Sequence, residues 1–174
     1  MAHDSQAWEN YRQGRELIQK ADPDYNKAKE FLEKAVDLIT EDEIFPRTDD
    51  PHFLLGIVYE HLNMFEKAVD QYKMAIKKDE LNIAALTGLG NNYLWMGKFN
   101  SAVEVYNKAL EIDKEDIAAH YGLAYAYSSI DSMCAQAAGE LAIVMQKDQA
   151  YGYAGQLQNF IDDGCPKSDR WCSE

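Results

Sequence analysis

The chain has 174 residues, of which 47% are hydrophobic and 27% charged, as in an ordinary soluble globular protein of one domain. A formal net charge of -13 disfavours contact with phosphate backbones and anionic membranes, so nucleic-acid binding is not expected. No segment reaches the roughly 20 apolar residues that span a bilayer, and no apolar leader begins the chain. We therefore expect no membrane insertion and a cytoplasmic location. The alternative is an exported or periplasmic protein whose leader is absent from this sequence.

The first predicted elements are two amphipathic helices within residues 7–40, joined by a turn around Pro23. Small residues recur along them at Gly14, Ala28 and Ala35, where closely packed helices need them. An acidic loop is predicted over residues 41–50, bounded by proline residues that interrupt helices.

The next three segments, 51–82, 83–116 and 117–150, share a period of 34 residues. Each predicts a first helix with a leucine and a tyrosine four residues apart, and the first two also predict a second helix with alanine at fixed places. In the third segment the second helix slips by one inserted residue, so that Ala137 follows Ala102 after 35 residues. The residues that recur at 34 are Leu55, Leu89 and Leu123; Tyr59, Tyr93 and Tyr127; Gly56 and Gly90; Phe65 and Phe99; Ala68 and Ala102; Tyr72 and Tyr106; and Ala75 and Ala109.

This pattern, L-G-x2-Y followed by A-x3-Y, resembles the tetratricopeptide repeat. The resemblance implies an all-α superhelix of about four helix-turn-helix repeats, in which residues 7–40 are a degenerate first copy. Gly56, Gly90 and Ala124 are then the small residues where the first helix of a repeat crosses the second. Because one repeat cannot bury its apolar face alone, the repeats must stack.

A C-terminal capping helix is predicted over residues 151–164, followed by a tail over 165–174. Its apolar face contains Tyr153, Leu157, Phe160 and Ile161, and it is expected to cover the last repeat.

The cysteines are odd in number. Cys134 falls in a helical pattern, where a small buried thiol is expected. Cys165 and Cys172 lie in the tail, where they form a disulfide in an oxidising compartment or stay free thiols in a reducing one. In either state, these two cysteines are not expected to contribute to folding of the repeats.

No arrangement of side chains predicts catalysis, a metal site or a cofactor. His52 and His120 occupy equivalent places in their repeats, so helix packing accounts for both. The sequence contains no CxxC, HExxH or phosphate-binding loop, and the acidic pairs are expected to be solvated. We therefore predict a protein that is not an enzyme.

The predicted function is a protein-protein interaction adaptor that binds a peptide segment of a partner in the concave groove of the repeats. Exposed aromatic side chains facing that groove would mark the partner site, with two arginines available for an acidic residue. The alternatives are a scaffold that assembles with itself, as a homo-oligomer, and a small acidic chaperone that resembles those of bacterial secretion systems. The residues predicted to bind the partner are Trp8, Tyr11, Arg12, Arg15, Phe53, Ile57, His61, Asn91, Trp95, Tyr121 and Tyr125.

Overall fold

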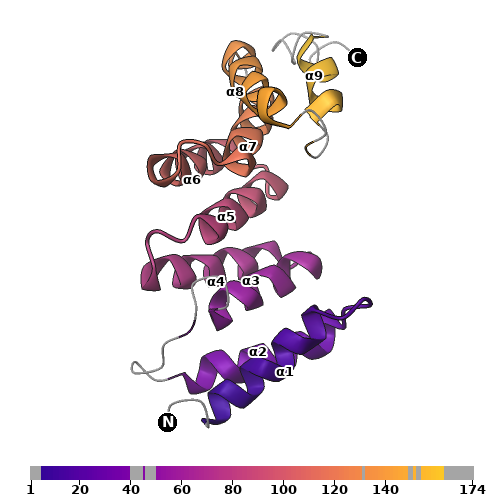
Figure 1. The fold of residues 1–174 in the computed structure, drawn as a ribbon, viewed down its shortest axis with the longest axis vertical. Coiled ribbons are helices and arrows are strands. Elements are labelled where there is room, and N and C mark those ends of the chain that lie inside the picture. The colour runs from indigo at the N-terminus through magenta and orange to yellow at the C-terminus, as the bar shows by residue number, and fades with distance from the viewer. Residues whose placement is uncertain are drawn as a thin grey trace. The chain divides into compact units, whose positions relative to one another are not determined.

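A computed structural model of the chain describes residues 5–39, 45, 50–130, 132–148, 151 and 154–162. Within these ranges the secondary structure consists of nine α-helices and no strand (Figure 1). The helices are α1 Gln6–Ile18, α2 Tyr25–Leu38, α3 Pro51–His61, α4 Phe65–Lys78, α5 Ile83–Trp95, α6 Phe99–Ile112, α7 Ile117–Ser128, α8 Cys134–Lys147 and α9 Ala154–Asp162. The all-α fold expected from the sequence is confirmed. The chain forms two compact units, Met1–Asn92 and Tyr93–Glu174, which divide within α5.

The start of most helices reflects their place in the repeat, although α2, a second helix, is capped by Asp24. In α1, α3, α5 and α7, the first helices of the repeats, a Ser, Asp or Asn side chain accepts a hydrogen bond from a backbone N–H of the first turn. In α4, α6 and α8 no side chain caps the helix. These helices follow tight turns, in which Asn63, Gly97 and Ser132 adopt positive φ angles. The tight turns therefore recur at the predicted period, with the one inserted residue falling before Ser132.

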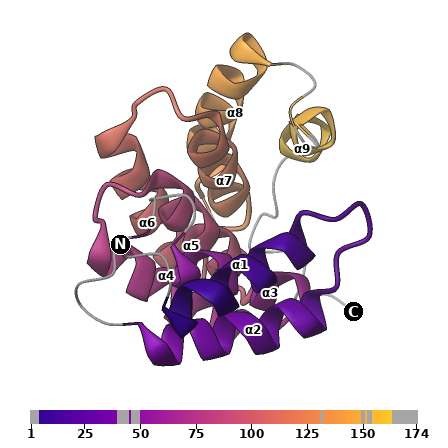
Figure 2. The same ribbon diagram turned by 60° about the horizontal axis from the view of Figure 1, so that its bottom comes forward.

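In the first unit, consecutive helices pack against one another, and Figures 1 and 2 both show α1 and α2 side by side. The turn between these two helices is longer than the turn between α3 and α4, as the spacing of Gly14 and Ala28 predicts. The repeat alanines Ala28, Ala35, Ala68 and Ala75 are completely or almost completely buried. Their small side chains let neighbouring helices approach closely, which is the role that the sequence predicts for them.

Tyr72 of α4 is held between two glycines of the first unit. A Cβ added to Gly56 of α3 would lie 2.8 Å from its ring, and one added to Gly88 of α5 would lie 2.7 Å from it. The crossing predicted at Gly56 is confirmed. The contact at Gly88 was not predicted, and it recurs in the second unit, where a Cβ at Gly122 would lie 2.2 Å from the ring of Tyr106.

A polar network holds the hydroxyl of Tyr72. The hydroxyl donates to Glu60 Oε2 at 3.0 Å, and the Asn92 side chain donates to the same oxygen at 2.8 Å and to the Gly88 carbonyl at 2.8 Å. Burial, and then the Glu60 carboxylate, raise the pKa of Tyr72 well above its ordinary value, so the hydroxyl remains a donor. Three helices of the first unit are therefore joined through one carboxylate.

Two polar expectations differ from the structure. Asp50, expected in a solvated loop, is buried, caps α3 through the His52 N–H at 2.9 Å and lies 3.2 Å from Lys78 Nζ. Cys134, expected to be a free buried thiol, is half-buried and disulfide-bonded. The other cysteines of the chain, Cys165 and Cys172, lie outside the described residues.

In the second unit, α9 packs on the last helix pair. Ala154, Leu157 and Ile161 of α9 are buried in one cluster with Leu141 and Val144 of α8 and Ala124 of α7. This is the contact predicted for the capping helix. Phe160, expected on the same buried face, is instead 47% exposed. It lies on another side of α9, and that side forms the site described next.

Candidate functional site

A pocket of about 310 Å³ lies between α7 and α9 in the second unit. Two of the predicted partner-binding residues line it, and the remaining wall comes from the end of α7 and from the capping helix. Its lining residues are Tyr121, Tyr125, Ser128, Ser129, Gln156, Leu157 and Phe160.

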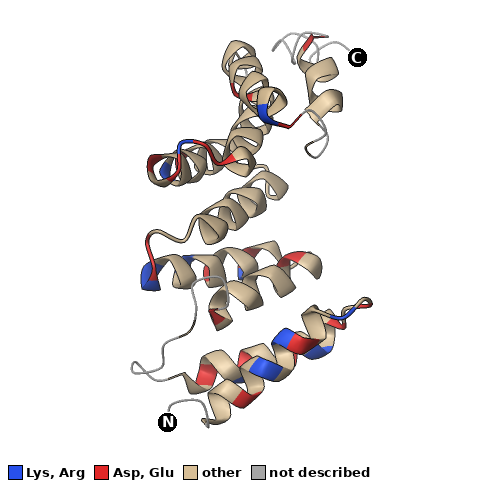
Figure 3. Cartoon of the chain, in the orientation of Figure 1, with Lys and Arg blue, Asp and Glu red and all other residues tan. Residues whose placement is uncertain are grey.

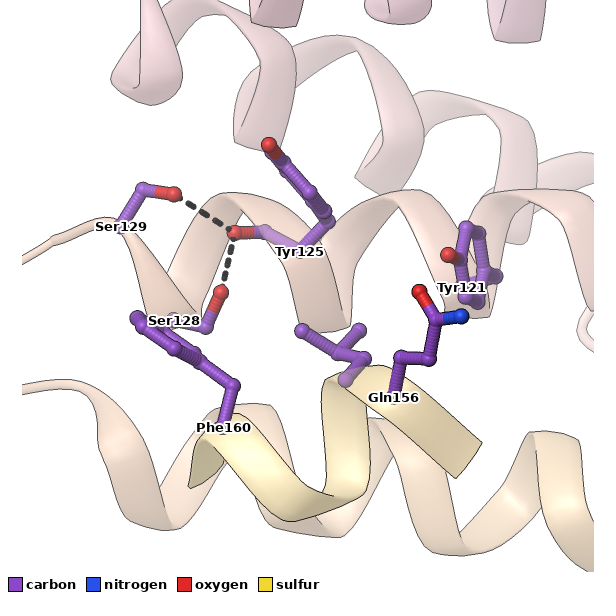
Figure 4. A pocket seen from close by; sticks show the side chains of 7 residues that line it. Tyr121, Tyr125, Ser128, Ser129, Gln156 and Phe160 are labelled. Carbon is purple, nitrogen blue, oxygen red and sulfur yellow. Dashed lines mark hydrogen bonds between the residues drawn. The ribbon is translucent and has the colours of Figure 1, made fainter. Parts of the chain in front are cut away.

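The fold of α9 determines which of its side chains reach the pocket. Leu157 and Ile161 are four residues apart and are buried in the core, whereas Phe160, directly before Ile161, is 47% exposed. Figure 4 shows Phe160 projecting from α9 toward Ser128, and Gln156 projecting toward Tyr121. Because α9 is predicted from the sequence only as a cap, its contribution to a binding pocket was not predicted.

The hydroxyl groups at the end of α7 are already oriented. Ser128 Oγ donates to the Tyr125 carbonyl oxygen at 2.8 Å, and Ser129 Oγ donates to the same oxygen at 3.1 Å (Figure 4). A hydroxyl that has donated its hydrogen keeps its oxygen lone pairs as acceptors. Ser128 is buried, whereas Ser129 is half-buried, so the Ser129 oxygen can accept a hydrogen bond from an N–H group of a bound chain.

The side chains of the pocket carry no formal charge. Helix α7 contains no Asp, Glu, Lys or Arg, as is also true of α5, and α9 contains only Asp162, whereas α1 and α2 carry many charges (Figure 3). Tyr125 and Phe160 are 45% and 47% exposed, large fractions for aromatic side chains. The pocket thus combines exposed aromatic surface with a few polar groups, as sites that bind organic ligands and peptide side chains do.

Two carboxylates act on Tyr151, whose ring contacts Tyr121 at one end of the pocket. Tyr121 contacts Tyr151 with ring centroids 5.6 Å apart in a T-shaped arrangement. Burial, followed by Asp116, the neighbouring Tyr121 and then Asp148, raises the pKa of Tyr151. Asp116 caps α7 by accepting from the Ala119 N–H at 2.7 Å, and Asp148 ends α8. Negative charge is therefore concentrated beyond Tyr121, at the start of α7.

The first unit places its predicted site residues differently. Tyr11 is only 2% exposed, and Phe53 is also buried, so the expectation that both face solvent is wrong. The ring of Phe45, from the predicted acidic loop, stacks on Trp8 at 4.2 Å and meets Tyr11 edge-on at 5.0 Å. Phe45 thus covers Trp8 and Tyr11 with apolar surface, which is not expected of a solvated acidic loop.

The other predicted residues of this unit are more accessible. The exposed Arg12 pairs with Glu9, and the ring of His61 stacks on that of Tyr25 at 4.3 Å. Arg15 and Ile57 are half-buried, while Asn91 is exposed. None of these residues lines the pocket between α7 and α9.

Trp95 is the most exposed large hydrophobic residue among those described, at 69%. It ends α5 and is not part of the pocket lining. Of the predicted partner-binding residues, the pocket therefore brings together Tyr121 and Tyr125 alone.

The described part of the chain offers little for other chemistry. It contains no group of three or more His, Cys, Asp or Glu side chains able to hold a metal ion. None of the helices described is long and apolar enough to cross a membrane. His120, which the sequence assigns to helix packing, is buried, with Nδ1 2.6 Å from Glu140 Oε2 and Nε2 3.0 Å from the Lys114 carbonyl oxygen.

Comparison with known proteins identifies the repeat. A family model described as TPR repeat matches residues 90–130, and no curated protein matches the chain. Among solved structures, MamA residues 41 to the end from Desulfovibrio magneticus RS-1 aligns with a TM-score of 0.78 and 17% identity, covering 93% of this chain and 86% of that one. YrrB, described as a TPR protein with an unusual peptide-binding site, aligns with a TM-score of 0.73 and 21% identity, covering 90% and 76%.

A third structure, of a tetratricopeptide repeat protein from Parabacteroides merdae ATCC 43184, has a TM-score of 0.73 and 18% identity and covers 90% of this chain and 59% of that one. Likeness at such identities establishes the fold, and TPR folds generally serve as protein-protein interaction modules rather than as enzymes. With the period of 34 residues, these matches show that the chain has the tetratricopeptide repeat fold and contains a TPR repeat over residues 90–130.

Proposed function

We propose that this protein binds a peptide segment of a partner protein in the pocket between α7 and α9, with an uncharged aromatic or large aliphatic side chain as the anchor. The observation that carries the proposal is the pocket itself, where Tyr125 and Phe160 stand half-exposed around about 310 Å³ of space. A volume of this size accepts one large side chain, and burial of such an anchor supplies much of the affinity of peptide complexes.

The polar groups of the pocket support a peptide as the ligand. The half-buried Ser129 oxygen can accept a hydrogen bond, and the exposed Gln156 amide can both donate and accept. A peptide backbone presents N–H and C=O groups next to every side chain, so an anchored segment would pair with these groups. YrrB, which shares the fold, is itself described as having a peptide-binding site.

The test is the affinity of a peptide selected by the full chain from a library of random dodecapeptides. We expect Tyr125→Ala and Phe160→Ala each to raise its Kd about 30-fold, because truncating a central aromatic anchor costs about 2 kcal/mol. Both side chains are half-exposed, so the melting temperature should change little.

The matched control is Met74→Ala, since Met74 of α4 is 42% exposed and stands on another helix pair. It should leave the Kd unchanged. Equal affinity of the parent and both aromatic variants, with all chains folded by circular dichroism, would place the binding site elsewhere.

A further inference from the structure

The partner's charge can be inferred from what surrounds the pocket, and this step depends on the proposed function. The described residues of the second unit contain eight acidic and four basic side chains, none of which lines the pocket. The pocket therefore selects an uncharged anchor, while its surroundings act on the residues that flank that anchor.

Two acidic residues stand beside the tyrosines at one end of the site. Asp116 precedes Tyr121 by five residues on α7, and Asp148 precedes Tyr151, whose ring contacts Tyr121. The Tyr151 N–H donates to the Asp148 carbonyl oxygen at 3.2 Å, which fixes the tyrosine beside the end of α8. The basic side chain at this end, Lys147, is paired with Glu115.

At the opposite end the described lining residues are uncharged, and Asp162 of α9 accepts a hydrogen bond at 2.7 Å from Gln158, which does not line the pocket. Ser128 and Ser129 end α7 there, and Phe160 approaches them from α9 (Figure 4). A peptide lying along α7 would thus meet Asp116 and Asp148 at the Tyr121 end and uncharged lining residues at the Phe160 end.

We propose that the partner segment is basic on one side, with a Lys or Arg two to four residues from an aromatic or large aliphatic anchor, so that the cation reaches Asp116 and Asp148 while the anchor fills the pocket. The spacing follows from length. Nine helical residues separate Asp116 from Tyr125, about 13 Å at 1.5 Å per residue, and an extended peptide covers that distance in about four residues. Because the side chain of Lys or Arg is itself long, the basic residue can stand one or two residues closer to the anchor.

The experiment uses the full-length chain, the dodecapeptide library and the double variant Asp116→Asn with Asp148→Asn. Asn preserves the cap of α7, because it is as good an N-cap residue as Asp. We expect the selected peptides to share an apolar anchor with Lys or Arg enriched on one side. The double variant should raise the Kd of the best peptide about fivefold, an effect that shrinks in 0.5 M salt. Glu104→Gln removes one negative charge from α6 and should not change the Kd.

The outcomes separate this inference from the function on which it rests. Peptides that depend on Tyr125 and Phe160 but lack flanking basic residues, or that bind the double variant equally well, overturn the inference and leave peptide binding in place. Peptides that depend on neither aromatic side chain overturn both. A dimer in light scattering that Phe160→Ala abolishes would show that a second copy of the chain is the occupant, which also overturns the inference.

Discussion

A chain that ends at Ala150 should melt about 5 °C or more below a chain that ends at Asp162, and it should associate at high concentration. The shorter chain lacks α9, whose Leu157 and Ile161 cover Leu141 and Val144. Burial of one Leu-sized side chain contributes about 1.5–3 kcal/mol, and each kcal/mol corresponds to about 2–4 °C in a chain of this length. Exposed Leu141 and Val144 would form an apolar patch that favours association.

Comparison with the chain that ends at Asp162 isolates the helix, because both chains lack the tail. Both also lack Cys165 and Cys172, so any effect of the Cys134 disulfide cancels. Thermal melts by circular dichroism and light scattering provide the readouts. If the two chains have the same melting temperature and both remain monomeric, then α9 does not cap the repeats.

The same substitution at two glycines should change stability in opposite directions. Gly122→Ala should lower the free energy of unfolding by about 1–2 kcal/mol, because its Cβ would lie 2.2 Å from the fully buried ring of Tyr106. This overpacking outweighs the gain of about 1 kcal/mol that alanine brings to a helix interior. Gly139→Ala should keep that gain, since Gly139 is exposed in α8 and nothing lies within 4 Å of an added Cβ.

Denaturant titration of both variants and the parent measures the difference, which we expect to be about 2–3 kcal/mol between the variants. A Gly122→Ala chain as stable as the Gly139→Ala chain would mean that the Tyr106 ring moves aside without cost. The close contact between successive repeats would then not be a determinant of the fold.

The period of the sequence predicted most of the fold, because a repeat shows the same packing requirement several times. Gly56 was placed correctly from its motif position, and Ala68 and Ala102 are fully buried as expected. Gly88 and Gly122 are also 34 residues apart, but they lie outside the L-G-x2-Y motif. Their contacts with tyrosines of the preceding helix were therefore not predicted.

The candidate site was less predictable because it depends on segments outside the repeat. Tyr11 and Phe53 were assigned to a solvent-facing stripe by helical position alone, which does not reveal that a loop residue such as Phe45 covers one of them. Phe160 was predicted to lie on the buried face of the capping helix. It stands three residues after Leu157 and one before Ile161, so helical position alone does not decide whether its side chain faces the core or the solvent. Charge alone did not single out the pocket, because α5 and α7 both contain no Asp, Glu, Lys or Arg and α9 contains only Asp162.

The most direct test of the pocket between α7 and α9 is a titration of the ¹⁵N-labelled full chain with the selected dodecapeptide, followed by amide chemical shifts. We predict that the largest changes fall on Tyr125, Ser128, Ser129, Gln156 and Phe160, with little change in α2 and α4. Changes concentrated on α2 or α4, with the amides of α7 and α9 unmoved at saturation, would contradict the assignment of this pocket as the peptide-binding site.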